Sequence, residues 1–176
     1  MRQLQKVLWT KGVLLNPQHL QTQDRYLESL LAFRLSALAF YPWGFAELAF
    51  DREALSGSVL NLSRAIGLLP DGLVFDIGGA DPAPPPLPLA EHWRPDQTSM
   101  LVHLAIVEQS TGRMSVAPRM GERDTRYVAE VVLRRDENTG LGEKPIQVAR
   151  KNLRLVGEGE SLEGMVSLPI ARIRRG

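Results

Sequence analysis

The hydrophobic period of this chain changes once, near Gly44, and this change limits the possible folds more than any other feature of the sequence. Before Gly44 the apolar residues recur at helical spacing, and after it they alternate as they do in strands. No fixed-period repeat is visible along the chain. The sequence therefore predicts one long helix followed by a body made of strands.

The helix is predicted to begin at Asn16-Pro17, because Asn can cap a helix and Pro suits the first helical position. It is expected to be amphipathic, to run for about six turns, and to end at Pro42 and Gly44. The apolar positions on its one face are Leu20, Leu27, Leu30, Leu31, Leu35 and Leu38.

The segment after Gly44 predicts a small antiparallel meander. Its strands are expected at Ala46–Phe50, Val59–Arg64 and Leu73–Ile77, with Asp51–Gly57 as a turn. The run Leu69-Pro70-Asp71-Gly72 is a strong turn signal, since Gly tolerates positive φ.

The second half of the chain is strand-like throughout, with strands expected at Met100–Glu108, Tyr127–Leu133, Ile146–Val156 and Met165–Ile173. The apolar run at Met100–Glu108 is typical of a strand covered on both faces. Pro169 indicates an edge strand or a bulge. Short strands at this spacing indicate a sandwich or a barrel, and the predicted fold class is a mainly β, antiparallel β-sandwich with a long amphipathic N-terminal helix.

The stretch Asp81–Pro88 is rich in proline and favours an extended polyproline conformation. It is interpreted as a stiff surface loop between two groups of strands. A partner ligand of the PxxP type is the alternative, although no basic residue flanks the stretch in the sequence.

Composition excludes several classes of function. The formal net charge of the 176 residues is +1, whereas a dedicated nucleic-acid binder usually carries a basic excess. The basic run Arg172–Arg175 leaves contact with anionic lipid as a minor alternative. There are no cysteines, no apolar run of membrane-spanning length and no signal-peptide pattern, so a soluble cytoplasmic protein is expected.

A search for reactive groups finds no recognisable catalytic set. His19, His92 and His103 form no metal-binding motif, and no GxSxG nucleophile motif occurs. The stretch Gly157–Gly164 lacks the ending of a phosphate loop and carries carboxylates, so it is interpreted as a tight acidic hairpin turn. The aspartates at 71 and 76, or the glutamates at 158 and 160, would be the only acid/base pairs to propose. We expect no enzymatic activity, no cofactor and no metal.

The first 15 residues are predicted to form an arm with short strand character around a turn at Lys11-Gly12. A chain end this apolar must pack against its own domain, a sister subunit or another protein. The candidate interface residues are those of the arm and the start of the helix: Val7, Leu8, Trp9, Val13, Leu14, Leu15 and Leu20. Trp43 and Trp93 are further candidate anchors, although core packing is expected for each.

The N-terminal run from Val7 to Leu27, which contains Trp9, Pro17-Gln18-His19 and Asp24-Arg25-Tyr26, resembles the opening of the TssK family of type VI secretion baseplate subunits. Three further stretches match in order along the chain. They are Tyr41-Pro42-Trp43-Gly44, Leu69 to Asp76, and Glu160 to Gly164 leading into Val166 to Arg172.

The resemblance implies a structural role in the baseplate, with residues 1–15 as an arm and 16–176 as a β-sandwich shoulder domain like that of phage receptor-binding proteins. Family members have a neck and a head that this chain is expected to lack. The implied partners are the wedge proteins TssF and TssG, two further copies in a trimer, and, through the neck and head, the membrane complex TssJ/TssL/TssM. The implied location is the bacterial cytoplasm, beneath the inner membrane. A carbohydrate- or peptide-binding β-sandwich, with Trp43 and Trp93 as anchors, is the alternative.

Overall fold

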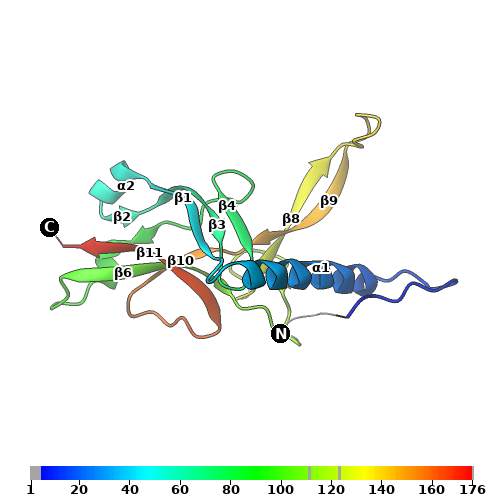
Figure 1. The fold of residues 1–176 in the computed structure, drawn as a ribbon. Helices are drawn as coiled ribbons and strands as arrows, with labels where there is room; N and C mark the ends of the chain where they lie inside the picture. The colour runs from blue at the N-terminus through cyan, green and yellow to red at the C-terminus, as the bar shows by residue number, and fades with distance from the viewer. Residues whose placement is uncertain (1–4, 111, 123, 176) are drawn as a thin grey trace.

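The computed structural model describes residues 5–110, 112–122 and 124–175. The first four residues of the predicted arm, Leu4 among them, lie outside this description, as do residues 111, 123 and 176. Figure 1 shows a group of strands with one long helix beside it and one hairpin that projects away from it. The described chain is thus mainly β, and nearly all of its strand pairs are antiparallel.

Helix α1 spans Pro17–Leu38 and begins where the sequence predicts. Asn16 has an extended backbone, and its carbonyl accepts a hydrogen bond from the His19 N–H at 3.0 Å. In return, Nδ1 of His19 accepts from the Asn16 N–H at 3.1 Å. His19 therefore takes the place that Glu or Gln holds in a capping box.

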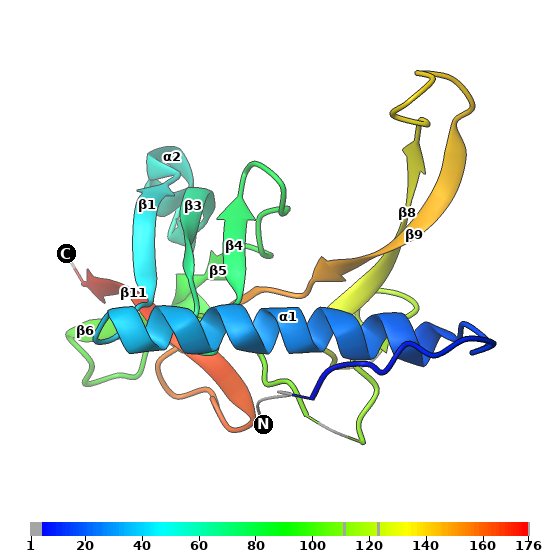
Figure 2. The same ribbon diagram turned by 45° about the vertical axis from the view of Figure 1, so that its right-hand side comes forward.

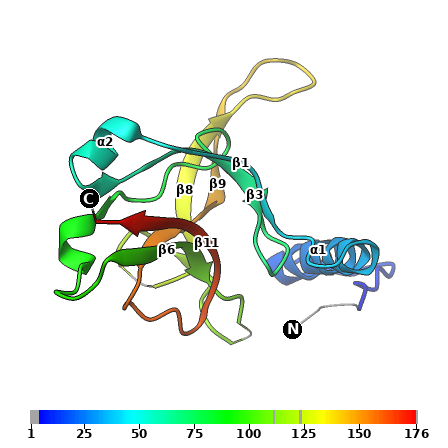
Figure 3. The same cartoon turned by 60° about the vertical axis from the view of Figure 1, so that its left-hand side comes forward.

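The helix ends earlier than Pro42, at Leu38, and Tyr41 then adopts a positive φ of 53°. None of the α1 residues is fully buried. Helix α1 comes close to another part of the chain at Ala32, which lies beside Gly72. A Cβ added to Gly72 would be only 3.0 Å from the Ala32 Cβ. In Figure 3 the helix is seen nearly end-on, beside the strands and not between them.

The predicted meander is present as the sheet β1-β3-β4, with β1 at Gly44–Phe50, β3 at Leu62–Leu68 and β4 at Val74–Ile77. The predicted turn joins β3 to β4, where the Gly72 N–H donates to the Leu69 carbonyl at 2.9 Å.

Two predictions in this region were wrong. Residues 52–56 form the short helix α2, Arg52–Ser56, because the Asp51 carboxylate caps it by accepting from the Glu53 and Ala54 N–H groups. The predicted strand Val59–Arg64 is split at Asn61 into β2, Val59–Leu60, and β3. Strand β2 pairs instead with β5, Leu87–Pro88, which is followed by the 3-10 turn η1, Leu89–His92.

The second main sheet has the order β10-β6-β11, with β6 at Ser99–Val107 in its centre, β10 at Arg154–Gly157 and β11 at Met165–Arg174. As predicted, Pro169 lies in an edge strand and beside a register shift. Strands β10 and β11 flank β6 on opposite sides. The acidic loop between them is therefore a crossover around β6 and not the predicted hairpin turn.

The two main sheets share one hydrophobic core. Its fully buried side chains include Phe75 and Ile77 from β4 and Met100, Val102, Leu104 and Ile106 from β6. The ring of Phe75 meets that of Phe45 edge to face, with 5.5 Å between the ring centres. Burial of alternate residues on both sheets is the principal source of stability for this body.

A third sheet, β7-β8-β9, carries the projecting hairpin. Strands β8, Tyr127–Arg134, and β9, Lys144–Lys151, pair antiparallel along their whole length, so the predicted strand Ile146–Val156 is interrupted after Lys151. Strand β7, Val116–Ala117, pairs only with the base of β8 and runs parallel to it, which differs from the antiparallel expectation. Figure 2 shows the outer part of the hairpin extending beyond the other strands.

Two ion pairs hold the base of this hairpin to the meander. Nη2 of Arg126, just before β8, lies 2.6 Å from Oδ2 of Asp71 in the β3–β4 turn. Nζ of Lys151, at the end of β9, lies 2.7 Å from Oδ2 of Asp81, just after β4. Arg126 and Asp81 are buried, whereas the side chains of Asp71 and Lys151 are 26% and 23% exposed, so each pair is partly shielded from water and salt.

Replacing Phe75 with Ala should lower the free energy of unfolding by about 3–5 kcal/mol, because it leaves a cavity in the shared core. The neighbouring change Val74→Ala is a matched control, since Val74 is exposed, and it should cost less than about 1 kcal/mol. Urea denaturation measures both values. Equal losses in the two variants would contradict the assignment of the core.

Replacing His19 with Ala should lower the free energy of opening the first turn of α1 by about 1 kcal/mol, because the Asn16 N–H loses its acceptor. His19→Gln should retain most of the protection, since Gln can accept the same hydrogen bond. The measurement is hydrogen exchange of the Asn16 amide. Equal exchange in both variants would show that the ring's packing, and not the hydrogen bond, protects the helix start.

Candidate partner interface

The arm lies along the first half of α1, as Figure 2 shows, and does not form strands. The predicted turn is present at Lys11-Gly12, where the Val13 N–H donates to the Thr10 carbonyl at 3.2 Å, but neither Val7–Trp9 nor Val13–Leu15 forms a strand. Strand pairing fails here because the neighbour is a helix, whose backbone groups are already bonded within it. Side chains make the contact instead: Nε1 of Trp9 donates to Oε1 of Gln23 at 3.2 Å.

Most of the predicted interface residues are exposed in this arrangement. Leu8 is 80% exposed and Leu14 is 78% exposed. Val7 is half-buried, and the Trp9 ring packs on one side near His19, with 5.9 Å between the ring centres. The exposed members of the set are Leu8, Trp9, Val13, Leu14, Leu15 and Leu20. The domain itself therefore leaves most of the arm's apolar surface uncovered.

The apolar face of α1 is also exposed. Residues on its other face, among them His19, Tyr26 and Ser29, are half-buried, whereas the apolar positions face solvent. Their spacing of three, four or seven residues puts them in one line along the helix. We call this line the α1 stripe: Leu20, Leu27, Leu31, Leu35 and Leu38. Leu30, which the sequence assigns to the same face, is half-buried instead.

An aromatic cluster follows the α1 stripe, and of its members only Trp43 was predicted from the sequence as a candidate anchor. The Phe40 and Tyr41 rings are 4.1 Å apart, and those of Tyr41 and Trp43 are 5.3 Å apart. Phe40 is 89% exposed and Trp43 is 41% exposed, so core packing of Trp43 was a wrong expectation. The available signal was three aromatic residues within four positions at a predicted helix end.

The other residues singled out by the sequence have structural surroundings. Trp93 packs against the shared core, as expected, and the Arg175 guanidinium lies 5.5 Å from its ring centre. His103 is half-buried within β6. His92 is half-buried too, with Nδ1 at 3.6 Å from a carboxylate oxygen of Glu160.

The carboxylates considered as acid/base pairs are each engaged elsewhere. Asp71 pairs with Arg126, and Oδ1 of Asp76 lies 2.6 Å from Nη1 of Arg64. Glu158 accepts from the Leu101 N–H at 2.8 Å. Within residues 5–110, 112–122 and 124–175, no three His, Asp or Glu side chains are grouped to hold a metal ion. Nor does any helix in these ranges have the length and apolarity to cross a membrane.

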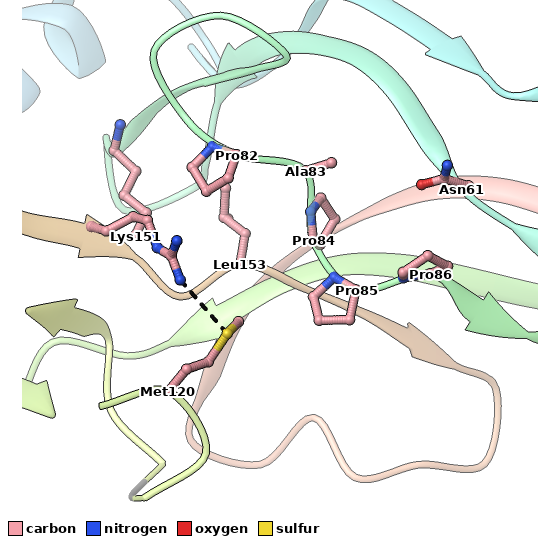
Figure 4. Close-up of a pocket in the computed structure, with 10 residues that line it drawn as sticks. Asn61, Pro82, Ala83, Pro84, Pro85, Pro86, Met120, Lys151 and Leu153 are labelled. Carbon is pink, nitrogen blue, oxygen red and sulfur yellow. Dashed lines mark hydrogen bonds between the residues drawn. The ribbon is translucent and has the colours of Figure 1, made fainter. Parts of the chain in front are cut away.

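A hollow of about 340 Å³ lies on the body beside the proline-rich stretch (Figure 4). We call it the proline pocket. Prolines form one wall, and β9 with the residues just beyond it contributes to the other. Its lining residues are Asn61, Pro82, Ala83, Pro84, Pro85, Pro86, Met120, Arg150, Lys151 and Leu153. Nη2 of Arg150 lies 3.6 Å from the Met120 sulfur, the contact drawn as a dashed line in Figure 4.

Comparison with known proteins agrees with this architecture. The chain is 35% identical over 171 residues to the type VI secretion system baseplate component TssK1 of Pseudomonas aeruginosa, covering 96% of this chain and 38% of that protein. It superposes on a crystal structure of TssK with a TM-score of 0.85 and 32% identity, covering 96% of this chain and 38% of that one. The chain thus spans less than half the length of these relatives.

A structure of the type VI secretion system TssK-TssF-TssG baseplate subcomplex, determined by cryo-electron microscopy, contains a chain that matches with a TM-score of 0.87 and 26% identity. The match covers 98% of this chain and 57% of that one. The sequence model of the family described as "Bacterial Type VI secretion, VC_A0110, EvfL, ImpJ, VasE" matches residues 19–176. This chain therefore belongs to the TssK family of the bacterial type VI secretion system.

Proposed function

We propose that this chain is a structural adaptor of the type VI secretion baseplate that docks onto the wedge proteins TssF and TssG through its N-terminal arm. The observation that carries the proposal is the exposure of Leu8, Leu14 and their neighbours on an arm that is nevertheless held in place along α1. A related chain occurs in a TssK-TssF-TssG subcomplex, which supports these two proteins as partners.

The energetics favour a small set of apolar anchors. Burying one Leu or comparable side chain contributes about 1.5–3 kcal/mol, so a few such residues can dominate an interface. The arm offers Leu8, Leu14 and Leu15, with Trp9 fixed beside them by its hydrogen bond to Gln23. A pre-positioned arm loses less conformational entropy on docking than a free one would.

The α1 stripe suggests a second contact, between copies of this chain. Five aligned leucines on one helix can pack against the same stripe of a sister subunit, as helices do in bundles. We propose that α1 contributes in this way to a homotrimer, and that in the longer family members the link to the membrane complex TssJ/TssL/TssM is made by parts outside the matched segment. The proposed location is cytoplasmic, at the baseplate beneath the inner membrane.

The role proposed here is non-enzymatic, which agrees with relatives that are named as baseplate components. The alternative of a carbohydrate- or peptide-binding module rested on the likeness to phage receptor-binding proteins and on Trp43 and Trp93. One of its two proposed anchor residues, Trp93, packs against the core instead. Trp43 instead joins the exposed cluster that follows the α1 stripe.

Changing Leu8, Trp9 and Leu14 together to Asp should abolish co-elution with TssF and TssG, because charged side chains would have to be buried in the interface. The matched control changes three exposed apolar residues of the hairpin, Val131, Leu133 and Ile146, to Asp. Size-exclusion chromatography of the mixed proteins measures binding, and circular dichroism checks the fold. Persistent binding by the arm variant, with the fold intact, would contradict the arm as the interface.

Changing Leu27 and Leu31 to Glu should reduce the mass of the particle from three copies to one, because four-carbon apolar side chains in the α1 stripe are replaced by carboxylates that repel one another. The control changes Gln18 and Gln21 to Glu, which adds the same charge to exposed positions outside the stripe. Light scattering after size exclusion gives the mass. A single-copy mass for the unaltered chain, or an unchanged trimer in the variant, would refute this use of α1.

A further inference from the structure

The proline-rich stretch has a burial pattern with a period of three residues. Asp81, Pro84 and Leu87 are buried, whereas Pro82, Ala83, Pro85, Pro86 and Pro88 are exposed. Three residues per turn is the repeat of a polyproline II helix. One of its three ridges therefore faces the body, and the other two face solvent.

Both ends of this stretch are fixed. Asp81 accepts from Nζ of Lys151 at 2.7 and 3.0 Å and from the Asp76 N–H at 2.9 Å. At the other end, Leu87 pairs with Leu60 and Pro88 with Val59 in the β2–β5 sheet. The exposed ridges are therefore pre-organised, which reduces the entropy that a partner must overcome on binding.

The proline pocket beside these ridges has a largely apolar lining. Its volume of about 340 Å³ is bounded by proline rings, Leu153 and the thioether of Met120, as Figure 4 shows. Aromatic side chains pack well against prolines in polyproline recognition and against methionine sulfur. Met120 is 54% exposed, so it can contact a group that enters the pocket.

The polar groups of the pocket define the rest of the partner's chemistry. Proline has no N–H, so the exposed prolines offer only carbonyl acceptors, and the partner must supply donors such as the Trp indole N–H or the Tyr hydroxyl. Lys151 is engaged by Asp81, but Nε of Arg150 lies 4.0 Å from Glu130, at the limit of an ion pair. A carboxylate on the partner would complement the Arg150 charge.

We propose that the proline pocket and the two exposed proline ridges are a docking site for a protein segment that carries Trp or Tyr next to Asp or Glu. The lack of a basic residue beside the prolines in the sequence made a PxxP ligand the less favoured interpretation. The fold supplies that residue from β9, as Arg150. The site shares no residue with the arm or the α1 stripe, so it stands or falls independently of the proposed docking to TssF and TssG.

The test is selection of a random dodecapeptide library, displayed on phage, against the immobilised chain. The recovered peptides should be enriched in Trp or Tyr beside Asp or Glu. A synthetic peptide of the recovered sequence should bind Arg150→Glu and Pro85→Ala about tenfold or more weakly, because each change removes one recognition element. The matched controls, Arg134→Glu and Pro145→Ala, alter the same residue types on the hairpin and should bind normally.

Thermal unfolding of each variant shows whether its fold is intact. Met120→Ala provides a third variant, and its loss of affinity would support the proposal even where Pro85→Ala is unstable. Two results would overturn the proposal: recovery of no aromatic-acidic sequence, or a recovered peptide that binds Arg150→Glu and Met120→Ala as tightly as the unaltered chain.

Discussion

Two ion pairs, each with one buried and one partly exposed member, join the base of the β8–β9 hairpin to the rest of the molecule. Asp71 lies in the β3–β4 turn and Asp81 just after β4, whereas Arg126 and Lys151 lie at the base of the β8–β9 hairpin. Burying charge is costly unless every group is paired, and here the pairing is extended: Arg126 also donates to the Val107 carbonyl at 2.8 Å. The pair at Asp81 links the end of β9 to the start of the proline-rich stretch, and both segments line the proline pocket.

The features that the sequence predicted correctly are those encoded by near neighbours. Asn16-Pro17 starts α1, Gly72 closes a turn, and Pro169 lies in an edge strand beside a bulge. The wrong prediction of one continuous strand through Asn61 has a long-range cause. Leu60 and Leu62 are both buried, as alternation implies, but the Asn61 carbonyl accepts from the Asp51 N–H, and the two leucines belong to different sheets. Only a distant partner, β5, decides that division.

The candidate interface was predictable from the sequence only in part, because near neighbours encode its pattern but not its contacts. An apolar arm was visible in the sequence, and so was the one-sided pattern of α1. Periodicity identifies a face, however, but not what that face contacts. Leu27 and Leu31 are exposed because the arm lies against another face of α1, where Trp9 is near His19 and Lys6 is near Tyr26. The aromatic cluster forms beyond the end of α1, where Tyr41 has a positive φ, and Arg150 of β9 is far from the prolines in the sequence and meets them only in the folded pocket.

The bulge at Pro169 has a consequence for a protein with so much uncovered apolar surface. Strand β11 borders its sheet, and a flat border of unpaired backbone groups invites another chain to add a strand without limit. Pro169 removes one donor from that border, and the shifted register bends it. Both features make this border a poor template for a strand from a second copy, so uncontrolled edge-to-edge addition is disfavoured there.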